Sequence, residues 1–270
     1  MAAEMSEPPG ARPLTPLVAA LWTVALTLVF WIVGGVTEAV RPGAENDIVN
    51  VTACQVLATS MVVFAMVRVH ARDASLRMTL GVRPIAPLHL VLAIAAGAGL
   101  FPLLATVDTL VLKRWPVDDQ AATEGLKKLL EATSPLALVV AAYVVMPLAR
   151  EIFFRGITYG ELRKAAGVRT ALLGTAAFYA CASLEWQEMP TAFALGLALA
   201  WLRERTGTVV AAVVAQLAFG AVEAIPILRG RDPQADVAYP ARWIVGGAVI
   251  SVLALAVVGI GRKSEDHDDT

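Results

Sequence analysis

Apolar residues run through this chain in long blocks, without the alternating or one-sided patterns of a soluble domain. A helix that crosses the hydrocarbon core of a bilayer needs about 20 apolar residues. Four blocks reach this length with few charges inside them, at 14–36, 48–69, 88–112 and 241–261. We expect each of these blocks to form a transmembrane helix.

The segment between Pro135 and Ile227 is equally apolar, but charged residues interrupt it. We divide this segment into four further helices, near 135–155, 168–184, 190–203 and 208–226. The predicted fold is therefore all-α, a polytopic membrane helix bundle of about eight transmembrane helices.

One membrane domain, 14–261, is expected between two short tails, 1–13 and 262–270, because no linker or repeat divides the chain. The apolar run after residue 13 is longer than the h-region of a signal peptide, so we expect it to be retained as the first span. Residues 118–132 have the pattern of an amphipathic helix lying at the interface, and a solvated connector fits them equally well.

Composition supports lipid as the principal surroundings of the chain. Hydrophobic residues make up 57% of the sequence and charged residues 17%, with a net charge of −1. This balance lacks the basic surface that nucleic acid requires, and we exclude nucleic acid as a partner. Cys54 and Cys181 fall inside predicted spans, so we expect both to be buried and no disulfide framework to form.

Lysine and arginine favour one orientation in the membrane. If the N-terminus is cytoplasmic, the inner segments hold 14 of the 22 basic residues. Cytoplasmic segments carry such an excess. We therefore expect a multi-pass protein of the plasma membrane, the inner membrane of the cell, with both termini in the cytoplasm.

Small residues recur in the predicted spans, where they permit close helix packing. They are Gly34 with Gly35, Gly97 with Gly99, Gly196 with Ala200, and Gly246 with Gly247.

Ionisable residues at membrane depth are costly, and they mark the places where chemistry is expected. The clearest group is Arg150, Glu151 and Arg155 at the end of the fourth predicted span. Glu151 and Arg155 are four residues apart, so they share a helix face and can pair. A charge patch at the cytoplasmic end of the span explains the same residues without any chemistry.

The stretch from Pro147 to Arg155, followed by Gly156 and Leu162, resembles the first motif of the CPBP intramembrane proteases, the family of CAAX prenyl protease 2. That motif has the form Glu-Glu-x-x-x-Arg. The similarity continues at Phe178 to Ala182, in the run from Phe193 to Gly207, and at Gln216 and Gly220. It is best over 135–223, with a weaker match at Leu80 to Arg83.

The resemblance implies a site of one glutamate that activates water, two histidines and an asparagine. This sequence departs from that pattern at all four positions, which are Arg150, Ala182, Gln216 and Gly220. A guanidinium group does not accept a proton, and the other three side chains do not titrate. They are also poor ligands for divalent metals, so we expect no metal and no cofactor. The retained Glu151 and Arg155 are expected to be a structural pair, with Arg150 as a second cation near Glu151.

Other acids are candidates to replace the missing groups. Glu185, Glu188 and Glu223 lie near the outer ends of the motif helices, and Asp108 lies late in the third span. Ordinary interfacial acids explain them as well. The histidines, at 70, 89 and 267, lie outside the motif helices, and no zinc-protease or serine-nucleophile motif is present.

Three functions remain open. The first is a catalytically inactive pseudoprotease that binds transmembrane substrates or an active protease partner, in the processing or sorting of membrane-anchored proteins. The second is an active intramembrane endopeptidase whose base is Glu151, Glu185 or Glu223. The third is a small transporter-like bundle that uses Arg150, Glu151 and Arg155.

Overall fold

The computed structural model describes residues 13–72, 74–116, 133–183, 185–229 and 239–261. Within these ranges the chain is built from helices, with no strand. They are α1 (Pro16–Val40), η1 (Ala44–Asn46), α2 (Ile48–His70), α3 (Leu76–Thr79), α4 (Pro87–Arg114), α6 (Pro135–Val140), η2 (Ala141–Val145), α7 (Met146–Glu151), η3 (Ile152–Thr158), α8 (Tyr159–Cys181), α9 (Met189–Thr206), α10 (Val209–Leu228) and α11 (Ala241–Gly261).

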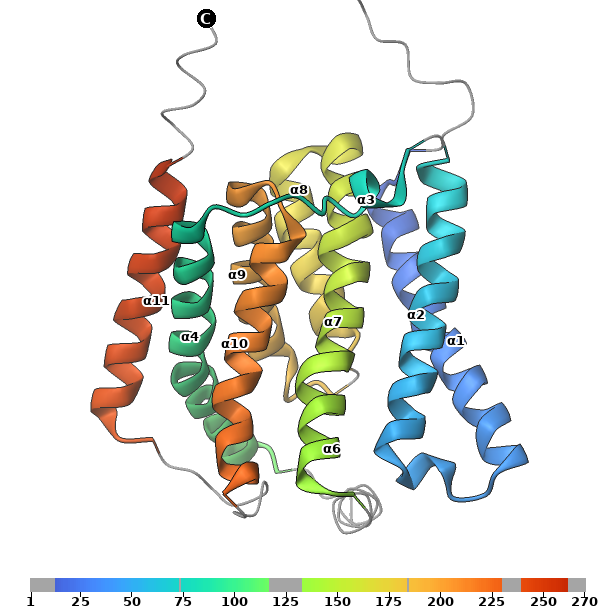
Figure 1. Ribbon diagram of the computed structural model, residues 1–270, viewed down its shortest axis with the longest axis horizontal. Helices are drawn as coiled ribbons and strands as arrows, with labels where there is room; N and C mark the ends of the chain where they lie inside the picture. Colours follow the sequence, from blue (N-terminus) through green and yellow to red (C-terminus); the bar gives the residue numbers. More distant parts are fainter. Residues whose placement is uncertain (1–12, 73, 117–132, 184, 230–238, 262–270) are drawn as a thin grey trace, which may run out of the picture.

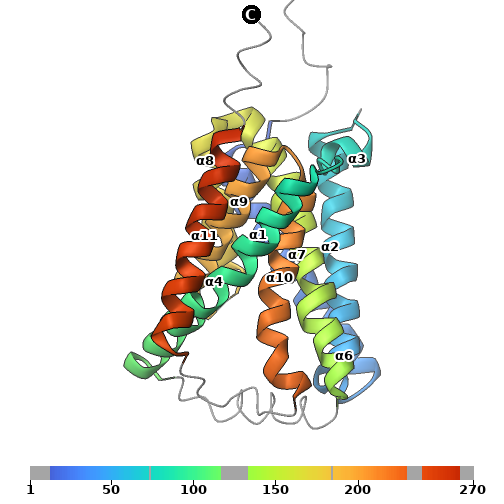
Figure 2. The same cartoon turned by 60° about the vertical axis from the view of Figure 1, so that its left-hand side comes forward.

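The long helices stand side by side in one bundle (Figure 1). α1 and α2 lie at one edge, α4 and α11 lie at the other, and α6, α7 and α10 lie between them. The start of α1 and the end of α11 are at the same end of the bundle, as an even number of crossings requires. Figure 2 shows α4 crossing α11 at an angle. The all-α helix bundle predicted from the apolar blocks is confirmed.

Six helical stretches in the described ranges are long and apolar enough to cross a membrane. One is the 47-residue path Pro135–Cys181, which runs from α6 to α8 and turns at Gly167, whose φ of 81° lies in the left-handed region. The predicted break near residue 168 corresponds to this turn. α9 carries Arg203, Glu204 and Arg205 in its last turns and is not among these six stretches, so the count of eight spans stays a prediction.

Apolar side chains also cover the outer surface of the bundle. Trp31 and Ile32 on α1 are each 63% exposed, and Val252 on α11 is 64% exposed. Exposed apolar patches of this extent mark contact with lipid or protein, because in water they would be unstable. The chain is a multi-pass membrane protein.

Three of the predicted small-residue contacts hold helices together. A Cβ added to Gly97 on α4 would strike the carbonyl oxygen of Ala215 on α10, and one added to Gly99 would lie 2.7 Å from the carbonyl oxygen of Gly247 on α11. Gly196 packs on α8. The expectation was wrong for Gly34, Gly35 and Gly246, where an added Cβ meets nothing within 4 Å, because these residues face away from their neighbours.

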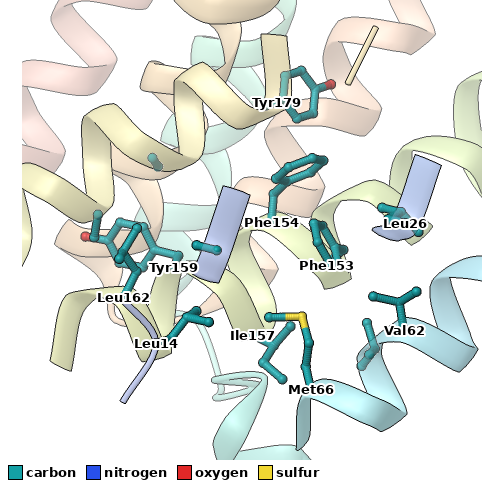
Figure 3. Close-up of a cluster of buried hydrophobic side chains, with 14 of the residues drawn as sticks. Leu14, Leu26, Val62, Met66, Phe153, Phe154, Ile157, Tyr159, Leu162 and Tyr179 are labelled. Carbon is teal, nitrogen blue, oxygen red and sulfur yellow. The ribbon is translucent and has the colours of Figure 1, made fainter. Parts of the chain in front are cut away.

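The core next to the first motif is aromatic. Phe153 and Phe154 in η3 are fully buried and pack edge to face, with ring centroids 4.8 Å apart. Figure 3 shows Phe154 next to Tyr179 of α8 and Ile157 next to Met66 of α2. These contacts fix the η3 segment between α2 and α8.

The two cysteines differ in burial. Cys54 on α2 is buried, whereas Cys181 is exposed. The expectation for Cys181 was therefore wrong, because it is the last residue of α8 and lies outside the packed core. The tails and the segment 118–132, predicted as an interfacial helix or a connector, lie outside the described residues, apart from residue 13.

Candidate functional site

A cavity of about 590 Å³ lies between α1, α2, α4, α7, α8, α9 and α10. All four positions at which the sequence departs from the CPBP motifs line this cavity. Arg150 comes from α7, Ala182 from the end of α8, and Gln216 and Gly220 from one face of α10. The structure therefore brings together residues that lie up to 70 positions apart, in the arrangement that a shared site requires.

The helix that carries Arg150 is interrupted by two π-helical segments, η2 and η3, on either side of α7. The Met146 amide donates to the Ala141 carbonyl, and the Tyr159 amide donates to the Phe154 carbonyl, each five residues earlier. Pro147 has no amide hydrogen and cannot continue the α-helical ladder. Such wide turns are frequent at functional sites. Here they flank the short helix that presents Arg150 to the cavity.

Arg150 is held against α8 and not against an acid. Its Nη2 donates a hydrogen bond to the Tyr179 carbonyl oxygen at 3.3 Å, and its Cζ lies 4.2 Å from the centre of the Tyr179 ring. Among the described residues no carboxylate forms an ion pair with it. A permanent cation thus stands on the cavity wall, where the family places its water-activating glutamate.

Glu151 and Arg155 lie behind the cavity wall and form the predicted pair. Both side chains are 0% exposed, and Arg155 Nη1 is 3.1 Å from Glu151 Oε1. Arg155 Nη2 also donates to the Gly196 carbonyl oxygen of α9 at 2.7 Å, and its Cζ lies 4.4 Å from the Tyr179 ring centre. Arg155 therefore joins η3 to α8 and α9. Arg155 links these helices and does not line the cavity.

The three uncharged positions have different surroundings. Ala182 leaves open space in the cavity. Gly220 permits close packing of α10 against η2, since a Cβ there would lie 3.2 Å from Tyr143 Cβ and 3.3 Å from the Tyr143 carbonyl oxygen. Gln216 is only 7% exposed, and its Oε1 has no hydrogen-bond partner among the residues that the structure describes. A larger residue at 220 would force η2 and α10 apart.

Carboxylates line the same cavity. Asp108 from α4, Glu188 before α9 and Glu223 from α10 are all on its wall, whereas Glu185 is not. Asp108 accepts a 2.6 Å hydrogen bond from the Thr191 hydroxyl, so it has the bundle partner that a deep acid needs. Partial removal from water raises the pKa of Glu188, the charges of Glu185 and Asp108 act in the same direction, and the charge of Arg150 opposes them.

The described residues contain no group of three His, Cys, Asp or Glu side chains placed to hold a metal ion. His70 accepts a 2.9 Å hydrogen bond from Trp22 Nε1, away from the cavity, and His267 lies outside the described residues. Among the described residues of the cavity wall, Asp108, Glu188 and Glu223 are the carboxylates that could exchange a proton with a molecule inside the cavity.

Sequence reasoning missed the wall that α1 and α2 contribute. Phe30 and Trp31 of α1 and Gln55 of α2 line the cavity. An amide inside a predicted span, as at Gln55, was the available signal, because polar groups at membrane depth face the bundle interior or a water-filled cavity. The aromatic residues carried no signal, since lipid-facing positions have the same composition.

The loop from Leu80 to Arg83, similar to a short family motif, fastens the opposite end of the site helices. The Val209 amide donates to the Gly81 carbonyl at 3.1 Å, and the Thr208 hydroxyl donates to the Arg83 carbonyl at 2.9 Å. Gly81 has a φ of 64° and contacts the Arg203 guanidinium, so only glycine fits this turn. The loop thereby fixes the turn between α9 and α10.

Comparison with protein families agrees with this geometry. Residues 132–222 match the model of the type II CAAX prenyl endopeptidase Rce1-like family. Over this segment the chain is similar to the Rce1-like family. No curated protein and no solved structure matches the chain. The matched segment covers α6 to most of α10, in agreement with the range 135–223 predicted from the motifs, and it includes all four altered positions of the Rce1-like site.

Proposed function

We propose that this protein is a catalytically inactive member of the Rce1-like family that binds transmembrane segments. The observation that carries the proposal is the Arg150 guanidinium on the cavity wall, at the motif position of the family's first glutamate. With a pKa above about 12, a guanidinium does not accept a proton from water near neutral pH. The motif position that would activate water therefore has no general base.

The scaffold around the altered positions is intact. The Glu151–Arg155 pair, the Gly196 contact and the clamp of the Gly81 loop all remain. The cavity is open and has an apolar wall from α1 and α2, which suits a helical ligand with apolar side chains. Retention of the scaffold together with loss of the chemical groups favours binding without hydrolysis.

The ligand is proposed to be a membrane-anchored protein substrate or a related active membrane protease. We further propose that the protein acts in the processing or sorting of such proteins in the plasma membrane. Both termini of this chain are proposed to lie in the cytoplasm. Fusion of a reporter to each terminus, active only in the cytoplasm, tests the orientation. An active reporter is expected at both ends, and inactivity at either end refutes it.

The test of inactivity uses purified protein in lipid nanodiscs with prenylated and transmembrane peptides. The unmodified protein is expected to bind a peptide without cleaving it. The variant Arg150→Glu, Ala182→His and Gln216→His returns the titratable groups, and it is tested with and without Gly220→Asn, which must displace Tyr143. Robust cleavage by the unmodified protein would refute the proposal.

A second candidate is an active endopeptidase with a relocated base, because three carboxylates line the cavity. Of the proposed bases, Glu151 is buried in an ion pair and Glu185 is not on the cavity wall, which leaves Glu223. If the protein cleaves a peptide, Glu223→Gln should abolish turnover. Cleavage that is unchanged by Glu223→Gln removes this candidate.

A further inference from the structure

The connection between α2 and α4 carries a row of arginines across one end of the bundle. Figure 1 shows α3 and the chain that follows it at the end where α1 begins and α11 ends. In sequence, residues 71–86 hold Arg72, Arg77 and Arg83 against one acid, Asp73. The connection is therefore basic at the level where the helices leave the apolar layer.

Three guanidinium groups meet at the segment Leu76–Arg83, which we call the arginine loop. Arg77 Nε donates to the Val82 carbonyl oxygen at 3.3 Å. Arg203, from the last turns of α9, contacts the residue before Val82, which is Gly81. Arg77 and Arg83 are exposed, and neither forms an ion pair with a carboxylate of the described residues.

Arg203 is partly buried and lies mainly among like charges. Its Nε donates to the Arg155 carbonyl oxygen at 3.1 Å, a neutral acceptor that leaves the charge uncompensated. The charges of Arg83 and Arg163 repel it, and the charge of Glu204 attracts it. Glu204, however, already forms a 2.7 Å ion pair with Arg163. A partly desolvated cation in such surroundings is stabilised by an anion supplied from outside the chain.

Apolar side chains of the arginine loop are turned outward beside the arginines. Leu76 is 55% exposed, Met78 is 74% exposed and Val82 is 37% exposed. Exposed apolar residues next to basic ones are typical of a segment at the membrane interface, where apolar groups enter the acyl boundary and guanidinium groups stay among the headgroups. This pattern places Arg77 and Arg83 at the level of the lipid phosphates.

We infer that the arginine loop, together with Arg203, binds the phosphate group of an anionic phospholipid. A guanidinium group binds phosphate through two parallel hydrogen bonds, so several of them around one loop suit this group. A zwitterionic phospholipid brings an ammonium group that the arginines repel, so the site prefers a lipid with a net negative charge. The inference does not depend on the proposed binding of transmembrane segments.

A lipid bound at the arginine loop stabilises the turn between α9 and α10. The backbone of the same loop holds this turn, since the Val209 amide donates to the Gly81 carbonyl at 3.1 Å and the Thr208 hydroxyl donates to the Arg83 carbonyl at 2.9 Å. A ligand that binds the folded loop shifts the equilibrium toward the folded protein. Anionic lipid therefore supports the helices that line the cavity.

The test measures binding of the first lipid to the full protein by native mass spectrometry. The probes are phosphatidylglycerol, phosphatidylcholine and, as a free phosphate, glycerol 3-phosphate. Each basic residue near a membrane surface contributes roughly fivefold to the affinity for anionic lipid. Phosphatidylglycerol should bind more tightly than phosphatidylcholine. Arg83→Gln should reduce this preference about fivefold, and Arg77→Gln with Arg83→Gln about 25-fold.

Arg169→Gln is the matched control. Arg169 is exposed, forms no ion pair with a described carboxylate, and follows the turn of α8 at Gly167, which lies at the same end of the bundle (Figure 1). This variant removes the same charge outside the arginine loop and should keep the preference. As a second readout, phosphatidylglycerol in nanodiscs should raise the melting temperature of the unmodified protein and of Arg169→Gln more than that of Arg83→Gln.

Three outcomes would overturn the inference. The first is equal affinity of the unmodified protein for phosphatidylglycerol and phosphatidylcholine. The second is a loss of preference in Arg169→Gln as large as in Arg83→Gln, because general surface charge would then explain the effect. The third is binding of glycerol 3-phosphate as tight as that of phosphatidylglycerol, which would assign the site to a free phosphate. Arg83→Gln keeps the backbone bonds to Thr208, so the comparison does not depend on the double variant.

Discussion

Replacing Arg155 with methionine should destabilise the bundle more than any other change of a single charge described above. The side chain is 0% exposed, its Nη1 lies 3.1 Å from Glu151, and its Nη2 donates to the Gly196 carbonyl at 2.7 Å. In Arg155→Met, Glu151 stays buried and loses the ion-pair partner that it has among the described residues. Breaking a buried pair in this way costs about 3–5 kcal/mol.

The double variant Glu151→Leu with Arg155→Met separates the two contributions to this cost. It removes the stranded charge, and replacement of both partners by apolar residues is often neutral or stabilising. The double variant should therefore recover most of the lost stability. The Gly196 carbonyl still loses its donor, so a cost of about 1 kcal/mol should remain.

The measurement is the apparent free energy of unfolding in a mixed-micelle denaturation series. Arg163→Met provides the matched control, because the Arg163–Glu204 pair is 2.7 Å long but Arg163 is 43% exposed. Exposed pairs contribute roughly 0–1 kcal/mol. A loss below 1 kcal/mol in Arg155→Met, or a double variant as unstable as the single one, would refute the assignment of Arg155 as a buried link between helices.

Three further predictions concern separate parts of the bundle. Gly97→Ala should cost about 1–3 kcal/mol through steric overlap, whereas Gly246→Ala should change the free energy of unfolding little; equal effects would contradict the helix contacts. Glu188→Gln should raise the melting temperature at pH 8, because folding raises the pKa of Glu188 and its ionised form therefore destabilises the fold. The difference in melting temperature should vanish once the pH falls below the normal pKa range of glutamate. A stabilisation by Glu188→Gln that appears only at low pH would contradict this prediction. A small membrane-permeant maleimide should label Cys181 and spare Cys54 until the protein is unfolded, and mass spectrometry of the two peptides shows whether the order is reversed.

Hydrophobic block length predicted the helices well where charges were few. The last span was expected at 241–261 and is α11, Ala241–Gly261, and the second was expected at 48–69 and is α2, Ile48–His70. Between α6 and α8 the boundary was harder to place. The helix continues there through two π-helical segments, and the turn falls at Gly167, whose φ of 81° lies in the left-handed region that favours glycine.

The candidate site was predictable in its members but not in its surroundings. The spacing of Glu151 and Arg155 predicted their ion pair, and motif positions placed Arg150, Ala182, Gln216 and Gly220 together. The convergence of Asp108 with Glu188 and Glu223 depends on how α4 packs against α9 and α10, and spacing within one helix contains no such information. Similarly, Gly220 alone does not reveal that Tyr143 of η2 packs against it.

The central claim is that this helix bundle binds a transmembrane segment without hydrolysing it. The most direct measurement incubates the purified, unmodified protein in nanodiscs with a bound transmembrane peptide and follows the peptide by mass spectrometry over a range of pH. The account predicts that the peptide is retained and stays intact. Peptide fragments that form at a rate proportional to the protein concentration, and that disappear in Glu223→Gln, would contradict it.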